Sequence, residues 1–376
     1  MQKARIGLIQ LFFLMALFQS GSAVIVGVGI NARQDAWIAI LLGMAAGMLL
    51  FLIYAYLFSQ YPELPLSKYA EKILGSFLGK FVGFLYALYF CYIGARVLRD
   101  FADLVIIELI PETPMFVISL LMILVVIYGC YAGFEVIARS SEIFFPIVFV
   151  IALAFAIFVL VGDLPDVKHL QPVLEDGWTN VFSVVFPLLI TFPFGELIAF
   201  TALLPYVSQY KNNIVIKVGL GAILFTGLFL SLLMSLIIAV MTPEITQYSA
   251  FPLLDVVEKI NIRDFIQRID PVAVVILHVG GFFKIVIFAY AAIVSLSTVF
   301  NTEEKKGWVT YTVAGMIYIP SLIIADNTIE HFQVGLEWVP YYLHIPFQII
   351  IPLLLAVIVV MKNFFSRKKS NQSASS

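Results

Sequence analysis

The stretch TFPFGELIAF, residues 191–200, lies inside an apolar run that covers residues 181–204. Near its middle it holds a proline, a glycine and a carboxylate, Pro193, Gly195 and Glu196. A proline has no N–H for the helix and clashes with the preceding turn, and a glycine permits backbone paths that other residues cannot follow. We therefore expect the helix to kink or unwind here. Freed backbone groups at membrane depth are tolerated only inside protein or along a wet cavity.

The composition of the chain is that of an integral membrane protein. Of its 376 residues, 62% are hydrophobic and 12% are charged, and the mean hydropathy is +1.02. A soluble domain is about half apolar and about a quarter charged. The net charge of −2 and the absence of a basic stripe outside the C-terminal tail argue against nucleic-acid binding. Cys91 and Cys130 both fall in apolar runs and indicate neither a disulfide framework nor a metal site.

The hydropathy pattern predicts an all-α fold with about ten transmembrane helices, because each apolar run holds the roughly 20 residues that cross a bilayer. We expect one membrane domain over residues 1–362 and a polar cytoplasmic tail over residues 363–376. The end of this tail, SRKKSNQSASS at 366–376, is predicted to lack regular structure. The predicted spans, one to ten, are 8–30, 36–60, 81–110, 115–133, 143–162, 181–205, 213–241, 271–299, 308–325 and 338–361.

The distribution of basic residues predicts the orientation of these spans. If the N-terminus lies inside, 14 of the 22 Lys and Arg residues fall on the inner side and 5 on the outer side. Cytoplasmic connections carry the excess of Lys and Arg, so both termini should face the cytoplasm. The outer segment 242–270 mixes apolar and charged residues at helical spacing, which predicts short amphipathic helices at the membrane surface.

The span count also suggests an internal symmetry. Five spans followed by five place the two halves, roughly residues 8–162 and 181–361, in opposite topology, so spans one and six correspond. Both are interrupted, by QSGSAVIVGVG at 19–29 and by TFPFGEL at 191–197. Paired Gly/Pro breaks in inverted halves indicate the binding site of a broken-helix transporter fold.

The two breaks supply most of the candidate ligand-binding residues. Glu196 either fixes the kink by hydrogen-bonding the broken helix ends or binds an ammonium group or a proton. In span one, small residues permit either close helix packing or backbone exposure to a ligand. Span eight adds Lys284 near mid-membrane, which either belongs to the site or forms a salt bridge to a neighbouring helix such as span three. The candidates are Gly21, Ser22, Pro193, Phe194, Gly195, Glu196 and Lys284.

Span three carries an unusual number of charges for a membrane helix. Arg96, Arg99, Asp100 and Asp103 fall within roughly a 100° arc of an ideal helix. The four-residue spacing predicts Arg96–Asp100 and Arg99–Asp103 ion pairs, and Glu108 lies further around and nearer the outer surface. These residues form either a purely structural network or a polar lining for a solute or ion path. Span eight also holds His278, which is more typical of a satisfied core histidine.

The sequence carries no metalloprotease, serine-hydrolase or phosphate-loop motif, and its four histidines are scattered. We therefore expect neither an enzyme nor a bound metal or cofactor.

Several motifs together resemble the endospore germination permease family. They are QSGSAVIV, QDAWIAILL at 34–42, RSSEIFFPI at 139–147, LQPVLEDGW at 170–178, FPFGELIAFTALLPYV at 192–207, FPLLDVVEKI at 251–260, IQRID at 266–270 and FFKIVIFAYAA at 282–292. Their order is preserved over nearly the whole chain.

That family is the B subunit of spore nutrient-germinant receptors, within the amino acid–polyamine–organocation superfamily. The resemblance implies a ten-helix broken-helix fold in the inner membrane of the spore. It also implies assembly with a membrane-embedded A subunit and a lipoprotein C subunit, and sensing of an amino acid or similar small metabolite. Gly21 and Ser22 match the family's motif in span one, Glu196 its glutamate in span six and Lys284 its lysine in span eight.

These observations predict a nutrient-sensing membrane subunit that binds a small germinant between the breaks in spans one and six. Two alternatives remain open, because a fold does not fix a function. One is a transporter that moves an amino acid or polyamine with a proton. The other is a subunit that conducts ions or water along the charges of span three.

Overall fold

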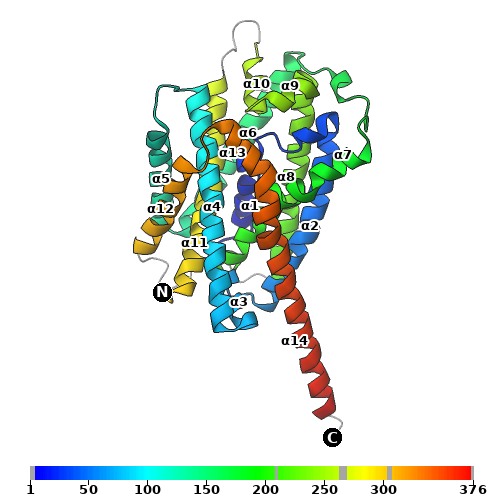
Figure 1. The fold of residues 1–376 in the computed structure, drawn as a ribbon. Coiled ribbons are helices and arrows are strands. Elements are labelled where there is room, and N and C mark those ends of the chain that lie inside the picture. The colour runs from blue at the N-terminus through cyan, green and yellow to red at the C-terminus, as the bar shows by residue number, and fades with distance from the viewer. Residues whose placement is uncertain (1–4, 208–210, 262–268, 303–306, 374–376) are drawn as a thin grey trace.

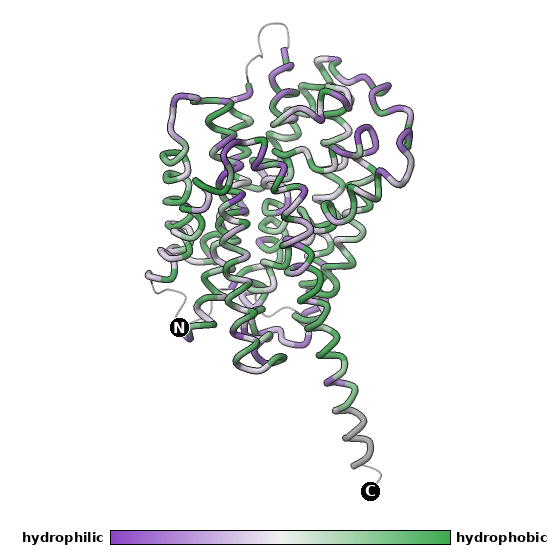
Figure 2. Tube along the Cα trace, in the orientation of Figure 1, coloured by the Kyte–Doolittle hydropathy of each residue, from purple (hydrophilic) through white to green (hydrophobic). Residues whose placement is uncertain are grey.

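The computed structural model describes residues 5–207, 211–261, 269–302 and 307–373. These residues form a bundle of helices, and Figure 2 shows hydrophobic residues along the bundle and hydrophilic residues in the connections at its ends. Within these described ranges, eight helices are long and apolar enough to cross a membrane, and two shorter apolar helices, Leu8–Ala23 and Gly307–Ile323, accompany them. Together they match the ten predicted spans.

The first half of the chain supplies spans one to five (Figure 1). Span one is α1 and its broken continuation η1, span two is α2, and spans three, four and five are α4, α5 and α6. The helix bounds are α1 (Leu8–Ala23), η1 (Ile30–Asp35), α2 (Ala36–Gln60), α3 (Leu66–Leu74), α4 (Ser76–Glu108), α5 (Met115–Ala132) and α6 (Phe134–Val161).

The second half supplies spans six to ten. Span six is divided into short pieces, spans seven, eight and nine are α8, α11 and α12, and span ten begins irregularly and ends as α14. The helix bounds are η2 (Val167–Leu170), α7 (Gly177–Val184), η3 (Val185–Phe194), η4 (Gly195–Ala202), η5 (Leu204–Tyr206), α8 (Asn212–Met241), α9 (Pro243–Tyr248), α10 (Pro252–Glu258), α11 (Asp270–Val299), α12 (Gly307–Ile323), α13 (Thr328–Gln333), η6 (Val334–Trp338), η7 (Pro340–Ile350) and α14 (Ile351–Ser373).

The packing of the helices follows the predicted symmetry. One set contains spans one, two, six and seven, in which α1 and α2 both pack against η3 and α8. A second set contains spans three, four, eight and nine, in which α4 and α5 both pack against α11 and α12. Each set therefore combines corresponding spans of the two halves, and α1 joins the sets by packing against α11.

Spans one and six are both broken, as predicted. In span one, α1 ends at Ala23 and six residues of turn follow, in which Gly27 and Gly29 have φ of 61° and 82°. This left-handed region strains residues that carry a side chain. In span six, Phe186 and Phe192 leave the helical region of φ and ψ, and Phe192 directly precedes Pro193.

Several boundaries differ from the prediction. Helix α6 begins at Phe134 rather than at 143, because its first turns carry an exposed Arg139–Glu135 ion pair and therefore lack an apolar signature. The amphipathic helix α3, which lies at the end of the bundle opposite α9 and α10, was not predicted (Figure 1). Helices α9 and α10 confirm the prediction for the start of segment 242–270, whereas 262–268 lies outside the described residues.

The predicted unstructured tail is wrong over most of its length. Helix α14 continues without interruption from the membrane span through Ser373 (Figure 1). Once a helix has formed, each further residue that becomes ordered adds one backbone hydrogen bond. Helix α14 can therefore continue beyond its apolar part.

Candidate functional site

The centre of the bundle contains a buried ion pair between spans six and eight. Lys284 Nζ in α11 lies 2.6 Å from Glu196 Oε2 in η4, and both side chains are excluded from the surface. The ammonium group also lies 4.6 Å from the centre of the Phe192 ring and 5.4 Å from that of Phe18. The aromatic faces add an electrostatic attraction for the cation. The break in span six therefore places a carboxylate within reach of an ammonium group that is otherwise surrounded by rings.

The end of α1 completes one side of this ion pair. A Cβ atom added to Gly21 would lie 3.0 Å from the Gly280 carbonyl oxygen and 3.1 Å from Lys284 Cβ. The glycine thus lets α1 approach α11 at the level of the lysine side chain. The next residue, Ser22, is buried and faces the other way, into a small cavity.

That cavity lies between spans one, three, six and ten and has a volume of about 50 Å³. Its lining combines both signs of charge with aromatic rings, and it includes two predicted ligand-binding residues. The polar and aromatic lining residues are Ser22, Arg96, Asp100, Phe192, Glu196, Phe332 and His344. Two parts of the sequence that were predicted separately, the broken helices and the charges of span three, therefore meet at one place.

The remaining residues of the span-six motif shape the break rather than line the cavity. Phe194 is buried against α2, where a Cβ atom on Gly47 would lie 2.4 Å from Phe194 Cβ. Gly195 faces span ten, and a Cβ atom there would lie 2.2 Å from Gln348 Oε1. Pro193 is buried and is not among the lining residues.

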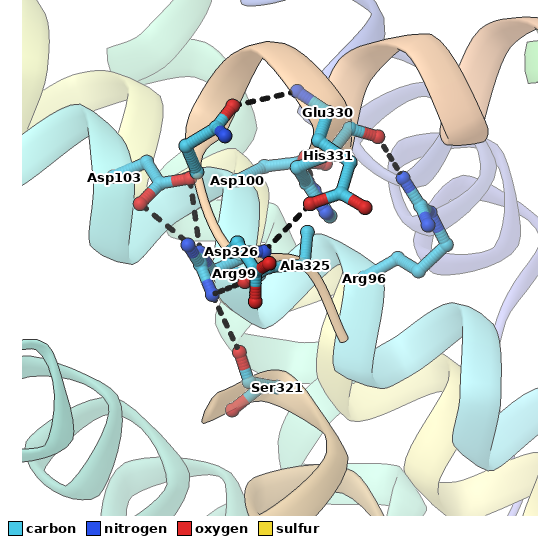
Figure 3. Close-up of polar contacts among 10 residues, drawn as sticks. Arg96, Arg99, Asp100, Asp103, Ser321, Ala325, Asp326, Glu330 and His331 are labelled. Atoms are coloured by element: carbon cyan, nitrogen blue, oxygen red, sulfur yellow. Dashed lines mark hydrogen bonds and ion pairs between the residues drawn. The ribbon is translucent and has the colours of Figure 1, made fainter. Parts of the chain in front are cut away.

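The charges of span three form a network with the connection between spans nine and ten (Figure 3). Arg99 Nε donates to both oxygens of Asp103, at 3.1 and 3.0 Å, and Arg99 Nη1 donates to the Ala325 carbonyl oxygen at 3.2 Å. His331 Nε2 in α13 lies 2.6 Å from Asp100 Oδ1, and Arg96 donates to the His331 carbonyl oxygen. The network therefore fixes α13 against α4.

Parts of the predicted network are wrong. The Arg99–Asp103 pair is confirmed, but Arg96 and Asp100 both bond to His331 of α13, which packs against α4 here. Glu108, at the last turn of α4, does not join the network. Its electrostatic neighbours are the acidic residues Asp255, Glu258 and Asp270 of segment 242–270.

Two predictions for span eight are resolved by geometry. The bond of Lys284 goes to span six and not to span three, since the break turns Glu196 toward α11. His278 is half-buried rather than a satisfied core histidine: its Nδ1 lies 2.8 Å from the Val274 carbonyl oxygen one turn earlier and its ring packs edge-on against Phe101, but its Nε2 has no hydrogen-bond partner among the described residues.

Sequence reasoning missed a cluster of buried polar residues around span ten. Tyr54 donates to the backbone oxygens of Gly195 and Gln348, at 3.2 and 2.7 Å, and so ties span two to spans six and ten. His344 and Gln348 lie on the same face of span ten and bond to Tyr89. The signal was present in HIPFQ, residues 344–348, where two polar residues four apart interrupt an apolar span.

Among the described residues, no group of three or more His, Cys, Asp or Glu side chains is arranged to hold a metal ion.

The fold matches solved transporter structures. MhsT in complex with L-phenylalanine superposes with a TM-score of 0.64 over 96% of this chain and 89% of that one, at 14% identity. Mhp1, a nucleobase-cation-symport-1 transporter with bromovinylhydantoin bound, gives 0.62 over 89% and 75%, at 13% identity. At these identities the likeness establishes the inverted-repeat transporter fold and no further property.

Sequence comparison identifies the family. The spore germination protein KB of Bacillus subtilis (strain 168) is 36% identical over 374 residues, which is the full length of both chains. The family model for spore germination proteins matches residues 5–329, which hold spans one to nine. The chain is a multi-pass membrane protein that belongs to the spore germination protein family.

Proposed function

We propose that this chain is the nutrient-sensing membrane subunit of a spore germinant receptor. In this proposal it lies in the inner membrane of the spore with both termini on the cytoplasmic side. A small nutrient, an amino acid or a similar metabolite, binds at the broken helices of spans one and six. The observation that carries the proposal is the buried Glu196–Lys284 pair beside a cavity of mixed polarity, at the point where both breaks meet.

The chemistry of the cavity suits a ligand that carries both a donor and an acceptor. Glu196 and Asp100 accept hydrogen bonds, and the ammonium group of a ligand competes with Lys284 for Glu196. Backbone N–H groups freed at the breaks hold the ligand's carboxylate, as half-helix ends do in transporters of this fold. The cavity of about 50 Å³ is smaller than the roughly 300–1,000 Å³ of typical small-molecule pockets, so in this proposal it widens when the ligand binds.

Binding acts by favouring one of two arrangements of the bundle. A ligand shifts such an equilibrium only through its different affinity for the two states. In the proposal the ligand breaks the Glu196–Lys284 bond, which joins the two helix sets, and the sets move relative to each other. The A subunit and the lipoprotein C subunit of the receptor sense this movement.

The proposal is tested in spores that carry the altered subunit at normal abundance. Gly21→Leu places a side chain against Gly280 and Lys284, and Glu196→Ala removes the carboxylate. We expect both variants to lose the nutrient-triggered response, while germination by agents that bypass the receptor continues. A double variant that responds fully would refute the assignment of the pocket.

One observation also favours a second candidate function, proton-coupled transport. A buried carboxylate–ammonium pair can release and regain a proton when a substrate disturbs it, and the fold is that of transporters. Uptake of an amino acid or polyamine into proteoliposomes, driven by a proton gradient, would support the transporter. Flux of ions or water through the isolated subunit would instead support a conducting role.

A further inference from the structure

The polar cluster of span ten contains a chain of hydrogen bonds that ends at the cavity. Gln348 Nε2 donates to the Tyr89 hydroxyl oxygen at 2.7 Å, and the same nitrogen lies 3.1 Å from His344 Nδ1. The Tyr89 oxygen lies 2.8 Å from His344 Nδ1. All three side chains are buried, so these bonds do not compete with bulk water.

The donors in this chain determine where the imidazole carries its proton. An amide nitrogen only donates, so a proton on His344 Nδ1 would face the Gln348 amide hydrogen across 3.1 Å. The Tyr89 oxygen already accepts from Gln348, and its own hydrogen is free to point at Nδ1. With the Gln348 amide oriented so that Nε2 faces the ring, His344 Nδ1 accepts, and this places the proton of a neutral ring at Nε2.

The backbone of span ten holds the ring in this position. Helix η7 is a π-helical segment, and such wide turns occur often at functional sites. The Tyr86 hydroxyl donates to the Phe347 carbonyl oxygen at 2.7 Å, and Tyr54 donates to that of Gln348. Nδ1 is directed at Tyr89 and Gln348 and His344 lines the cavity, so we place the other ring nitrogen, Nε2, toward the cavity.

We infer that His344 is a ligand-binding residue whose Nε2–H donates to an acceptor oxygen of the nutrient, and that Tyr89 and Gln348 are positioning residues that hold its tautomer. The inference rests on the proposed function and adds to it a third helix, span ten. Glu196 offers an acceptor and His344 a donor on the same cavity, so the site selects small ligands with an ammonium or hydroxyl group near a carboxylate or carbonyl oxygen.

The first test needs no ligand. The full-length protein, with ¹⁵N-labelled histidine and reconstituted in nanodiscs, is studied by NMR, and the His344 signals are identified by their loss in His344→Gln. We expect a neutral ring protonated at Nε2, and a mixture of tautomers in Tyr89→Phe and Gln348→Leu. A ring protonated at Nδ1, or at both nitrogens, at neutral pH would overturn the inference whatever the protein binds.

The second test measures equilibrium binding of glycine, L-alanine, L-serine and L-valine to the purified protein. His344→Phe keeps a ring but no donor, whereas His344→Gln keeps an N–H near the position of Nε2. For each amino acid that binds, we expect the affinity of His344→Phe to be about tenfold lower, because the variant lacks one hydrogen bond to the ligand. His344→Gln should bind nearly as the parent does, as should His169→Phe, altered in the outer connection between α6 and α7.

The outcomes separate the inference from the proposed function. If His344→Phe binds like the parent while Gly21→Leu does not, the pocket stands and the role of His344 falls. If the parent binds none of the amino acids, nor any other nutrient in a panel of sugars and nucleosides, both the nutrient site and the ligand role of His344 are refuted.

Discussion

Lys284 Nζ and Glu196 Oε2 lie 2.6 Å apart in the centre of the membrane domain, on spans of different helix sets. Neither group reaches the surface, so each is the counter-charge that the other needs. The bond connects the carboxylate at the break in span six to the lysine of span eight. Gly21 lets α1 pack against the same lysine. Three of the residues expected at the ligand site are thus coupled to one another.

Because the two charges depend on each other, we expect the single variant to lose more stability than the double variant. Lys284→Met should lower the free energy of unfolding by about 3–5 kcal/mol, because it leaves a buried carboxylate without a partner. Lys284→Met combined with Glu196→Gln should recover a large part of this loss, since no buried charge remains. Unfolding of the purified protein in detergent, followed by intrinsic fluorescence, measures the free energy of unfolding of the single and the double variant. A double variant less stable than either single one would contradict the pairing.

The close approach at Gly21 predicts a loss of ligand response from a single added side chain. Gly21→Leu forces α1 away from Gly280 and Lys284, so nutrient-triggered germination should fall to background at normal protein abundance. Gly315→Leu is the matched control, because a Cβ atom on that glycine of α12 meets no atom within 4 Å. An unresponsive Gly315→Leu variant would mean that the assay detects general damage.

The contacts of Arg99 predict that lysine cannot replace it. Its Nε donates to both Asp103 oxygens while Nη1 reaches the Ala325 carbonyl, and a lysine ammonium cannot span these acceptors. Arg99→Lys should lower the midpoint of thermal unfolding by several degrees, equivalent to about 1–3 kcal/mol. Arg139→Lys, in an exposed pair with Glu135, should change it by less than about 0.5 kcal/mol. Equal effects of the two would show that the buried network is unimportant.

The connections at the α9 end of the bundle should respond to acid. Arg33 Nη2 lies 2.6 Å from Glu244 Oε1, and hydrogen bonds from the backbone N–H of Glu244 itself and from Arg33 hold the pKa of Glu244 below its usual range. A lowered carboxyl pKa gives stability that is present above the ordinary pKa and is lost as the pH falls through the lowered one. Between pH 6 and pH 3, the parent should therefore lose slightly more stability than Glu244→Gln. Identical slopes would contradict the ion pair.

The sequence alone was sufficient to predict which segments form the membrane spans and where two of them are broken. Ten apolar runs, the breaks at QSGSAVIVGVG and TFPFGEL, and the symmetry of five and five spans all correspond to helices, turns and packing sets in the structure. These features are local, since hydropathy, proline and glycine act on the segment in which they occur. Boundaries beyond the apolar core, as in α6 and α14, lack such a local signal.

The partners of the charged residues could not be read from spacing. Lys284 finds Glu196 88 residues away, and Asp100 finds His331 231 residues away, because the breaks and connections bring these elements together. The four-residue rule succeeded for Arg99 and Asp103 and failed for Arg96, where α13 offered a closer acceptor. His344 was overlooked because a histidine in an apolar span has no visible partner until span ten is packed.

The most direct test of the nutrient site is equilibrium binding to the purified full-length protein in nanodiscs. A panel of amino acids, sugars and nucleosides is titrated into the parent, Gly21→Leu and Gly315→Leu by calorimetry. We predict saturable binding of at least one small nutrient with equal affinity in the parent and Gly315→Leu, and its loss in Gly21→Leu. Undiminished binding in Gly21→Leu, with the protein folded as judged by its unfolding midpoint, would contradict a site between the breaks of spans one and six.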